Sequence, residues 1–429
     1  MKRYTSLIRS CGAQELWQKA VHILQDMPRR GVQPNAITFT AAVSACLHAK
    51  QWPRSLALLP EMRRRGVEPD ATTYGVLVNV CRHGRAWEQA LYLLEDMSSR
   101  GVQPNPIVFG AAIGALERGR NWGMALAVLQ RLRSGLLEPG IVTYNATISA
   151  CEKGHAWAAA VALLSQISTA DRRLADTITY NATISACEKG SQWMAAVAIL
   201  HRMQENSVKL DSITYNAAIS ACRGGSQTAS VFHLFDQARH LGLADMVTYS
   251  AVISACEKVQ KWATAFALLN EMRQQLVAPG AITYNATIST SEKAHQWTMA
   301  LAALSQMRRQ QLAPDAISYN ATISACEKGH EWERVLCLME DMRVARIDGD
   351  VYTCSAAVSA CGKGQEWAIA ATLLQGMRRE QIEPGTVTYN AAISACEKGQ
   401  RWALGLSLLR SMQEERVERG AIAYNAAIS

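Results

Sequence analysis

The sequence predicts an all-α fold, an α-solenoid superhelix of about twelve helix-turn-helix repeats. All eleven Trp residues follow one period of about 35 residues along the chain of 429. Each period carries two apolar stripes with the 3- and 4-residue spacing of amphipathic helices, and Gly and Pro recur between the stripes. A fixed period of about 20 to 50 residues is typical of stacked repeats, because a helix pair buries its apolar faces only against neighbouring pairs.

The tryptophans set the repeat boundaries. Successive Trp residues lie 35 apart, except for 36 after Trp157 and for 69 between Trp193 and Trp262, where Thr228 occupies the missing Trp position. We therefore predict one array over residues 1–429, with positions counted from the first residue of each repeat. Repeats 1 to 12 and a partial thirteenth are 1–35, 36–70, 71–105, 106–140, 141–176, 177–211, 212–245, 246–280, 281–315, 316–350, 351–385, 386–420 and 421–429.

Each repeat is expected to form two helices joined by a turn. In repeat 5, Tyr144, Ile148 and Cys151 give the apolar stripe of a first helix, and Gly154 marks the turn. The second stripe consists of Trp157, Ala160, Val161, Leu164 and Ile167. We expect the recurring Trp, Cys and Met residues to pack in the core. Repeat 7 (212–245) lacks the usual Trp, Met and Pro, so we expect it to be the softest part of the array.

Composition excludes several classes of protein. A hydrophobic fraction of 49% and a charged fraction of 19% are those of a folded chain, and the net charge of +8 is weak support for an anionic partner. No apolar run reaches the ~20 residues of a membrane-spanning helix, so no membrane partner is expected. Residues 1–7 resemble neither a secretory signal nor a transit leader. The cysteines recur one per repeat without Cys-x-x-Cys pairs, so we expect no disulfides, no metal site, no cofactor and a reducing compartment.

The residues that open repeat 5 carry a family resemblance. Residues 141–154 read Ile-Val-Thr-Tyr-Asn-Ala-Thr-Ile-Ser-Ala-Cys-Glu-Lys-Gly, and many repeats close with Pro-Asp or Pro-Gly. This pattern and the 35-residue period resemble the pentatricopeptide repeat, in an array of the P type, over essentially the whole chain. A tetratricopeptide repeat has 34 residues and a different pattern. The resemblance implies binding of single-stranded RNA, one base per repeat.

In this family position 5 and the last residue of a repeat read the base. The position-5 candidates with a polar side chain are Thr5, Thr40, Asn145, Asn181, Asn216, Ser250, Asn285, Asn320, Ser355, Asn390 and, in the partial repeat, Asn425. The closing candidates are Asn35, Asp70, Asn105, Asp176, Asp211, Asp245, Asp315 and Asp350. A branched residue at position 2 is implied to lie between successive bases, here Ile37, Val142, Ile178, Ile213, Val247, Ile282, Ile317 and Val387.

The family's pairing rules turn these residues into an expected RNA sequence. Thr with Asn favours A, Thr with Asp favours G, and Asn with Asp favours U, which gives A-G-x-x-U-U-U-x-U-U-x-x from 5′ to 3′. We therefore expect a uridine-rich tract as partner. The chain departs from the pattern where Gly stands at a reading position and where position 2 is not Val or Ile. The glycines are Gly75, Gly110, Gly140, Gly280, Gly385 and Gly420, and the position-2 exceptions are Lys2, Thr72 and Tyr352.

A column of basic residues at position 13 could follow a phosphate backbone. It consists of Arg118, Lys153, Lys189, Lys258, Lys293, Lys328, Lys363 and Lys398. If all eight neutralised phosphates, log affinity against log salt would have a slope of about −5.6 as an upper bound. The alternative is that the recurring Glu-Lys is only a solvated helix end.

No nucleophile elbow, P-loop or paired-carboxylate motif is evident, so an enzyme is not expected. The leading hypothesis is a sequence-selective RNA-binding solenoid. By resemblance it would act in a chloroplast or mitochondrion, in RNA processing, stabilisation, editing or translation, with other RNA-processing proteins as further candidate partners. The alternative is a protein-binding scaffold of the tetratricopeptide type, which would not need Asn and Asp at fixed positions.

Overall fold

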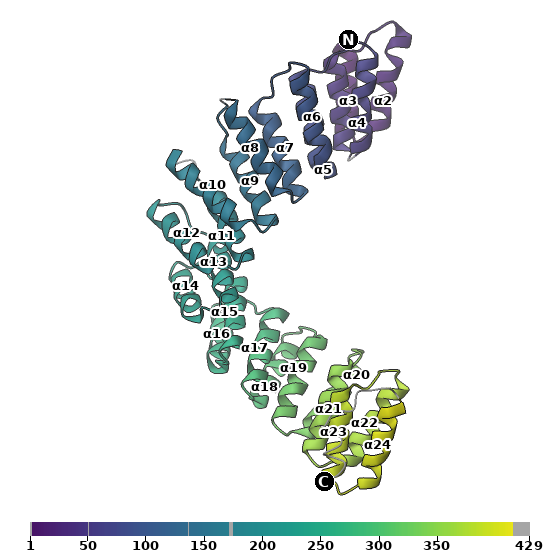
Figure 1. The fold of residues 1–429 in the computed structure, drawn as a ribbon, viewed down its shortest axis with the longest axis vertical. Coiled ribbons are helices and arrows are strands. Elements are labelled where there is room, and N and C mark those ends of the chain that lie inside the picture. The colour runs from purple at the N-terminus through teal and green to yellow at the C-terminus, as the bar shows by residue number, and fades with distance from the viewer. Residues whose placement is uncertain (1, 50, 136, 171–174, 415–429) are drawn as a thin grey trace. The chain divides into compact units, whose positions relative to one another are not determined.

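The computed structural model describes residues 2–49, 51–135, 137–170 and 175–414, and within them the regular structure is helical (Figure 1). The predicted all-α solenoid of helix pairs is confirmed. The first helices of the repeats are α1 (Lys2–Ala13), α3 (Ala36–His48), α5 (Ala71–Gly84), α7 (Pro106–Arg118), α9 (Ile141–Lys153), α11 (Thr177–Lys189), α13 (Ser212–Gly224), α15 (Met246–Lys258), α17 (Ala281–Lys293), α19 (Ala316–Lys328), α21 (Val351–Lys363) and α23 (Thr386–Lys398).

The second helices begin at the Trp position of each repeat. They are α2 (Trp17–Asp26), α4 (Trp52–Arg64), α6 (Trp87–Ser99), α8 (Trp122–Ser134), α10 (Trp157–Ala170), α12 (Trp193–Glu205), α14 (Thr228–His240), α16 (Trp262–Gln274), α18 (Trp297–Arg309), α20 (Trp332–Val344), α22 (Trp367–Arg379) and α24 (Trp402–Glu414). A short 3-10 helix, η1 (Pro28–Arg30), follows α2.

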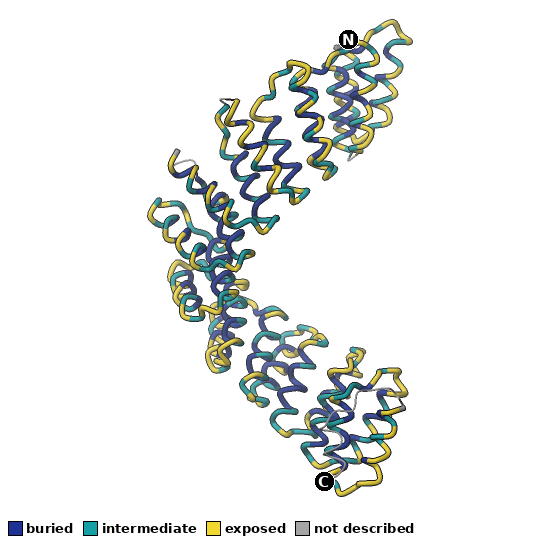
Figure 2. The backbone as a smooth tube through the Cα atoms, viewed as in Figure 1, coloured by how far each residue is buried: buried dark blue, intermediate teal, exposed yellow. Residues whose placement is uncertain are grey.

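The helix pairs form two compact bodies, residues 1–225 and 226–429, and the division falls inside repeat 7. Within each body a first helix packs against its own second helix and against the first helix of the next repeat, as α7 does with α8 and α9. The buried residues therefore lie mainly along the first helices, while the outer turns of the second helices are exposed (Figure 2). That repeat 7 is the softest repeat stays a prediction.

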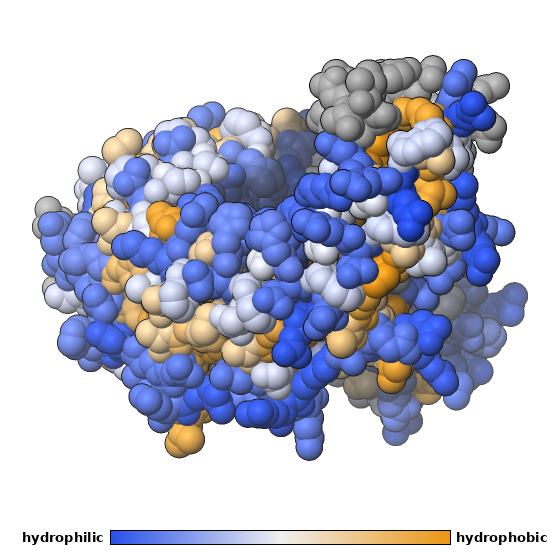
Figure 3. Space-filling model, turned by 90° about the horizontal axis from the view of Figure 1, so that it is seen from below, coloured by the Kyte–Doolittle hydropathy of each residue, from blue (hydrophilic) through white to orange (hydrophobic). Residues whose placement is uncertain are grey.

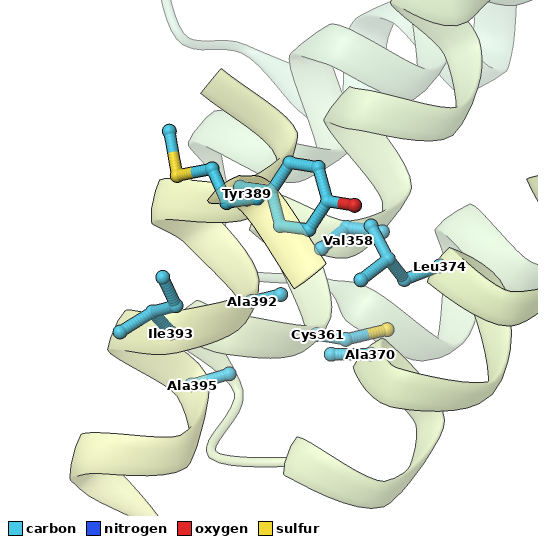
Figure 4. Close-up of a cluster of buried hydrophobic side chains, with 9 residues drawn as sticks. Val358, Cys361, Ala370, Leu374, Tyr389, Ala392, Ile393 and Ala395 are labelled. Atoms are coloured by element: carbon cyan, nitrogen blue, oxygen red, sulfur yellow. The ribbon is translucent and has the colours of Figure 1, made fainter. Parts of the chain in front are cut away.

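The apolar columns form the core, as expected. One cluster joins Val358 and Cys361 of α21, Leu374 of α22, and Tyr389 and Ile393 of α23 (Figure 4). Most of the cysteines at position 11 are buried and all are free thiols. Burial raises the pKa of the buried thiols of this column, in Cys81 to about 12, so these thiols stay protonated and act as small apolar groups.

The tryptophans lie on the second helices, as expected, but are less buried than a core position implies. Each lies at the start of a second helix, and most of them pack on the turn of the next repeat: a Cβ added to Gly329 would lie 2.3 Å from Trp297 Cδ1. The same contact pairs Trp52 with Gly84, Trp87 with Gly119, Trp122 with Gly154, Trp157 with Gly190, Trp193 with Gly225, Trp332 with Gly364 and Trp367 with Gly399. The indoles are therefore only partly buried, because helix ends lie near solvent. The expectation of a core position was right for their packing and wrong for their full burial.

Candidate nucleic-acid interface

The predicted reading residues lie on one face of the first helices. At 100° per residue, positions 2, 5, 9, 12 and 13 fall within about 100° of one another around the helix axis. Because the first helices of neighbouring repeats pack side by side, residues at these positions form columns that cross the repeats of each body. The apolar residues at position 2, the amides at position 5 and the charged residues at positions 12 and 13 thus share one surface, the reading face.

The Asn at position 5 is held in place by two repeats. In repeat 6, Asn181 Nδ2 donates to both carboxylate oxygens of Asp211 at 3.1 Å. The hydroxyl of Thr214, in repeat 7, lies 2.6 Å from Asn181 Oδ1 and donates to it. Asp211 itself is the N-cap of α13, where its carboxylate accepts the Thr214 backbone N–H at 2.8 Å. One Asp therefore begins a helix and orients the reading amide beside it.

This arrangement recurs wherever the two residues lie in one body as an Asn–Asp pair. The Nδ2-to-carboxylate distances are 3.3 Å from Asn145 to Asp176, 3.2 Å from Asn285 to Asp315 and 3.2 Å from Asn320 to Asp350. Burial alone would raise the pKa of these carboxyls, but hydrogen bonds from the following Thr or Ser and from the Asn amide outweigh it. The pKa of each Asp is therefore below its ordinary value, and each stays charged near neutral pH.

The other predicted readers have smaller or different contacts. The hydroxyls of Thr40, Ser250 and Ser355 each bond a position-3 hydroxyl of the next repeat, at 2.9, 2.7 and 2.6 Å. The closing residues Asn35, Asp70, Asn105 and Asp245 are helix N-caps. Thr5, Asn216 and Asn390, at position 5 of repeats 1, 7 and 12, lie on α1, α13 and α23, and Asn425 lies outside the described residues.

The apolar residues at position 2 are exposed beside the readers. Ile282 is 77% exposed, and the other predicted residues Ile37, Val142, Ile178, Ile213, Val247, Ile317 and Val387 are exposed as well. Sequence reasoning missed Ile107, which has the same exposure as Ile282 and holds position 2 of repeat 4. Its place at position 2 of the repeat could have identified it from the sequence. Tyr352, noted as a departure, is also exposed at this position.

The basic column at position 13 is largely paired. Five of its lysines contact the Glu at position 12 of the preceding repeat: Lys153 with Glu117, Lys189 with Glu152, Lys293 with Glu257, Lys328 with Glu292 and Lys363 with Glu327, at 2.7 to 3.0 Å. Lys258 Nζ donates to Ser226 Oγ at 3.3 Å. Lys398 lies exposed at the end of α23. The helix end is therefore more than solvated charge, and phosphate contact by these lysines stays a prediction.

The glycines at reading positions leave a hollow on this face. A cavity of about 690 Å³ is lined by Gly75, Gly110 and Gly140, with Ile107 and Val142 from position 2 beside them. The side chain of Arg82 also borders it. A Cβ added at Gly75 would meet Val108 Cγ2 only at 3.5 Å, an ordinary contact, so this position has room for a side chain.

The described residues offer neither a metal-binding cluster nor a membrane-spanning helix. Within residues 2–49, 51–135, 137–170 and 175–414, no group of His, Cys, Asp and Glu side chains is arranged to hold a metal ion. In the same residues, no helix is both long and apolar enough to span a bilayer. Apolar and hydrophilic residues are interspersed on the face shown in Figure 3.

Family models of the pentatricopeptide repeat match most of the sequence. Models of the pentatricopeptide repeat domain match residues 22–83, 92–153 and 337–399, and those of the single repeat match 4–32, 72–102 and 387–417. The model described as the pentacotripeptide-repeat region of PRORP matches residues 168–343. No curated protein matches the sequence.

Solved structures show the same fold. The pentatricopeptide repeat protein PPR10 from maize is 18% identical, with a TM-score of 0.55 over 99% of this chain and 70% of that one. PPR10 with an 18-nt psaJ RNA element matches over 100% of this chain and 76% of that one, at 18% identity and a TM-score of 0.42. The PPR domain of Arabidopsis thaliana PRORP1 with tRNA, 15% identical, matches 40% of this chain and 90% of that one, at a TM-score of 0.37. The family models together match residues 4–153 and 168–417, and the chain therefore belongs to the pentatricopeptide repeat family.

Proposed function

We propose that this protein binds single-stranded RNA sequence-selectively, one base per repeat, through the residues at position 5 and at the end of each repeat. The observation that carries the proposal is the Asn–Asp pair of repeat 6, in which the half-buried Asn181 is fixed by Asp211 and Thr214. A protein-binding scaffold of the tetratricopeptide type needs no such pairing.

The hydrogen-bonding groups of the fixed Asn amide determine what it can offer to a base. An Asn side chain has two N–H donors and two acceptor lone pairs. The bond to Asp211 takes an N–H and the bond from Thr214 takes a lone pair. A donor next to an acceptor remains for a base edge that presents an acceptor next to a donor, and each of the four bases has such an edge. The choice of uracil therefore comes from the family's pairing of Asn with Asp and not from the hydrogen-bonding groups of the amide.

The flanking columns supply the rest of the recognition. The exposed branched side chains at position 2, such as Ile178 and Ile213, lie one on each side of the Asn181 reading position along the array. A base that enters between them removes apolar surface from water, which adds affinity without regard to sequence. Base identity would then depend on the hydrogen bonds alone. We infer the binding order A-G-x-x-U-U-U-x-U-U-x-x.

By the same resemblance we propose that the target is an organellar transcript and that the protein acts in its processing, stabilisation, editing or translation. The array itself would bind rather than catalyse, and catalysis would come from other RNA-processing proteins.

Selection of RNA ligands from a random pool tests the proposal. The enriched sequences are expected to contain three successive uridines and, one base further 3′, two more. A variant with Asn145, Asn181, Asn285 and Asn320 all changed to Ala is expected to lose this motif. Asn270→Ala is the control, because Asn270 lies exposed on the second helix α16, away from the reading face. Enrichment of an unrelated motif, or none, would contradict the proposal.

A further inference from the structure

The paired lysines of the reading face form a ladder of ion pairs between repeats. Each step joins the Glu at position 12 of one repeat to the Lys at position 13 of the next, as in Lys153 to Glu117 at 2.7 Å and Lys328 to Glu292 at 3.0 Å. The Ser at position 9 of the second repeat is a third member. Ser149 donates to Glu117 at 2.9 Å, and Ser324 donates to Glu292 at 2.8 Å.

The carboxylate lies deeper than the ammonium group. The side chain of Glu292 is 16% exposed and that of Lys328 is 30% exposed, and the other pairs show the same order. The Glu is thus fixed by a Ser and covered by a Lys, while the Lys keeps one side open to solvent. An anion that approaches this Lys meets a pair whose net charge is zero.

The ladder lies beside the reading residues. Positions 5 and 12 are seven residues apart on one face of a helix, which is about 10.5 Å along its axis. An RNA strand whose bases meet the Asn column would carry its phosphates past one edge of that column, and the ladder follows such an edge. The lysines at position 13 lie along this edge, and five of them already pair with a Glu.

We propose that the Glu column at position 12 limits sequence-independent RNA binding by neutralising the lysines that would otherwise attract phosphates. This inference rests on the proposed RNA-binding function. A Lys must leave its Glu to neutralise a phosphate, so each phosphate contact gains less than a free Lys would give. A strand with the wrong bases is then held weakly, and stable binding requires the hydrogen bonds of the reading residues.

The last full repeat of the chain has the Lys at position 13 without a Glu to pair with it in the preceding repeat. Position 12 of repeat 11 is Gly362, so Lys398 at position 13 of repeat 12 has no carboxylate at the place where Lys328 has Glu292. Lys398 is accordingly expected to contribute more to the salt dependence of RNA binding than Lys328 does.

The test changes Glu117, Glu152, Glu292 and Glu327 together to Gln and measures binding of a 12-nucleotide oligoadenylate and of the selected uridine-containing RNA between 50 and 200 mM salt. Four freed lysines would steepen the slope of log affinity against log salt by up to about 2.8, since each phosphate neutralised on a single strand contributes about 0.7. Over this fourfold salt range that is an additional loss of up to about 50-fold in affinity. Oligoadenylate binding at 50 mM salt is expected to strengthen.

The control quartet carries the same change of charge elsewhere. Glu88, Glu95, Glu205 and Glu333 are exposed on second helices, and their change to Gln is expected to leave the slope close to that of the wild type. Circular dichroism verifies that both quartets stay helical. Equal slopes in the two quartets would overturn the proposal and make the Glu column a stacking contact only.

Single substitutions give a second measurement should the quartet unfold. Lys398→Gln is expected to flatten the salt slope more than Lys328→Gln does. In a Glu292→Gln background, Lys328→Gln is expected to flatten the salt slope as much as Lys398→Gln does in the wild type. Equal effects of the two lysines in the wild-type background would contradict the proposal. If the wild type binds uridine-containing RNA selectively but the Glu-to-Gln quartet leaves the salt slope unchanged, only the role of the Glu column is refuted. If the wild type binds no RNA at all, the proposed function is refuted as well.

Discussion

The contact between Trp297 and Gly329 makes a sharp prediction about how neighbouring repeats fit together. Gly329 has a φ of −82°, a conformation that Ala adopts without strain, so loss of unfolded-state entropy alone would stabilise Gly329→Ala by about 0.4–1 kcal/mol. The new Cβ, however, would lie 2.3 Å from Trp297 Cδ1 and 2.8 Å from Cγ. Overpacking of this kind costs about 1–3 kcal/mol, so the clash decides the sign.

We expect a net destabilisation of about 1 kcal/mol, near the lower end of this range, because two other repeats have Ala at this position. These residues are Ala49, in the repeat after Trp17, and Ala294, in the repeat after Trp262. Hydrogen exchange of α18 and α19 measures it locally, with amides exchanging roughly 5-fold faster for each kcal/mol lost. Gly376→Ala, in open space on α22, is the control and is expected to slow exchange. Trp297→Leu should remove the penalty. Slower exchange in Gly329→Ala would refute the reasoning.

Three further predictions concern the reading face. Asp211→Ala removes the N-cap of α13 and should destabilise that helix by about 1 kcal/mol, seen as faster exchange, whereas Asp211→Asn should keep the cap but weaken binding of uridine at the sixth base, measured by fluorescence anisotropy. Gly75→Thr should add an adenine preference at the third base of the selected motif, because the introduced hydroxyl side chain would complete a Thr–Asn pair with Asn105. The pKa of Asp315 is lowered, because the effect of its hydrogen bonds outweighs that of its burial. The stability that this carboxylate contributes is therefore present above its ordinary pKa of 3.8 and is lost as the pH falls through the lowered pKa. An acid titration of helicity in which Asp315→Asn loses this pH dependence checks it.

The sequence was sufficient to predict features that repeat within one period. The helix pairs and the buried Cys and Met columns follow from phase, because one position in the period has one environment. The pairing of position 5 with the last residue of the repeat was implied by the family resemblance and not by the period. Ile107 was missed although its phase placed it with Ile282.

Contacts between repeats were harder to predict. Glu and Lys are adjacent in the recurring Cys-Glu-Lys-Gly, yet the ion pairs join a Glu to the Lys of the next repeat, which depends on how the helices cross. The contact of Trp with Gly had a signal, however. The repeat that has Thr228 in place of Trp is followed by Val259 in place of Gly, so the residue without a facing indole is the one with a larger side chain.

The most direct test of the account changes one reading residue and selects RNA again. Asn181→Thr converts the pair of repeat 6 from Asn–Asp to Thr–Asp, the combination that Thr40 and Asp70 form in repeat 2. The sixth base of the enriched motif is expected to change from U to G while the other bases stay the same. An unchanged motif, or a change spread over several positions, would contradict base-by-base reading by the amides.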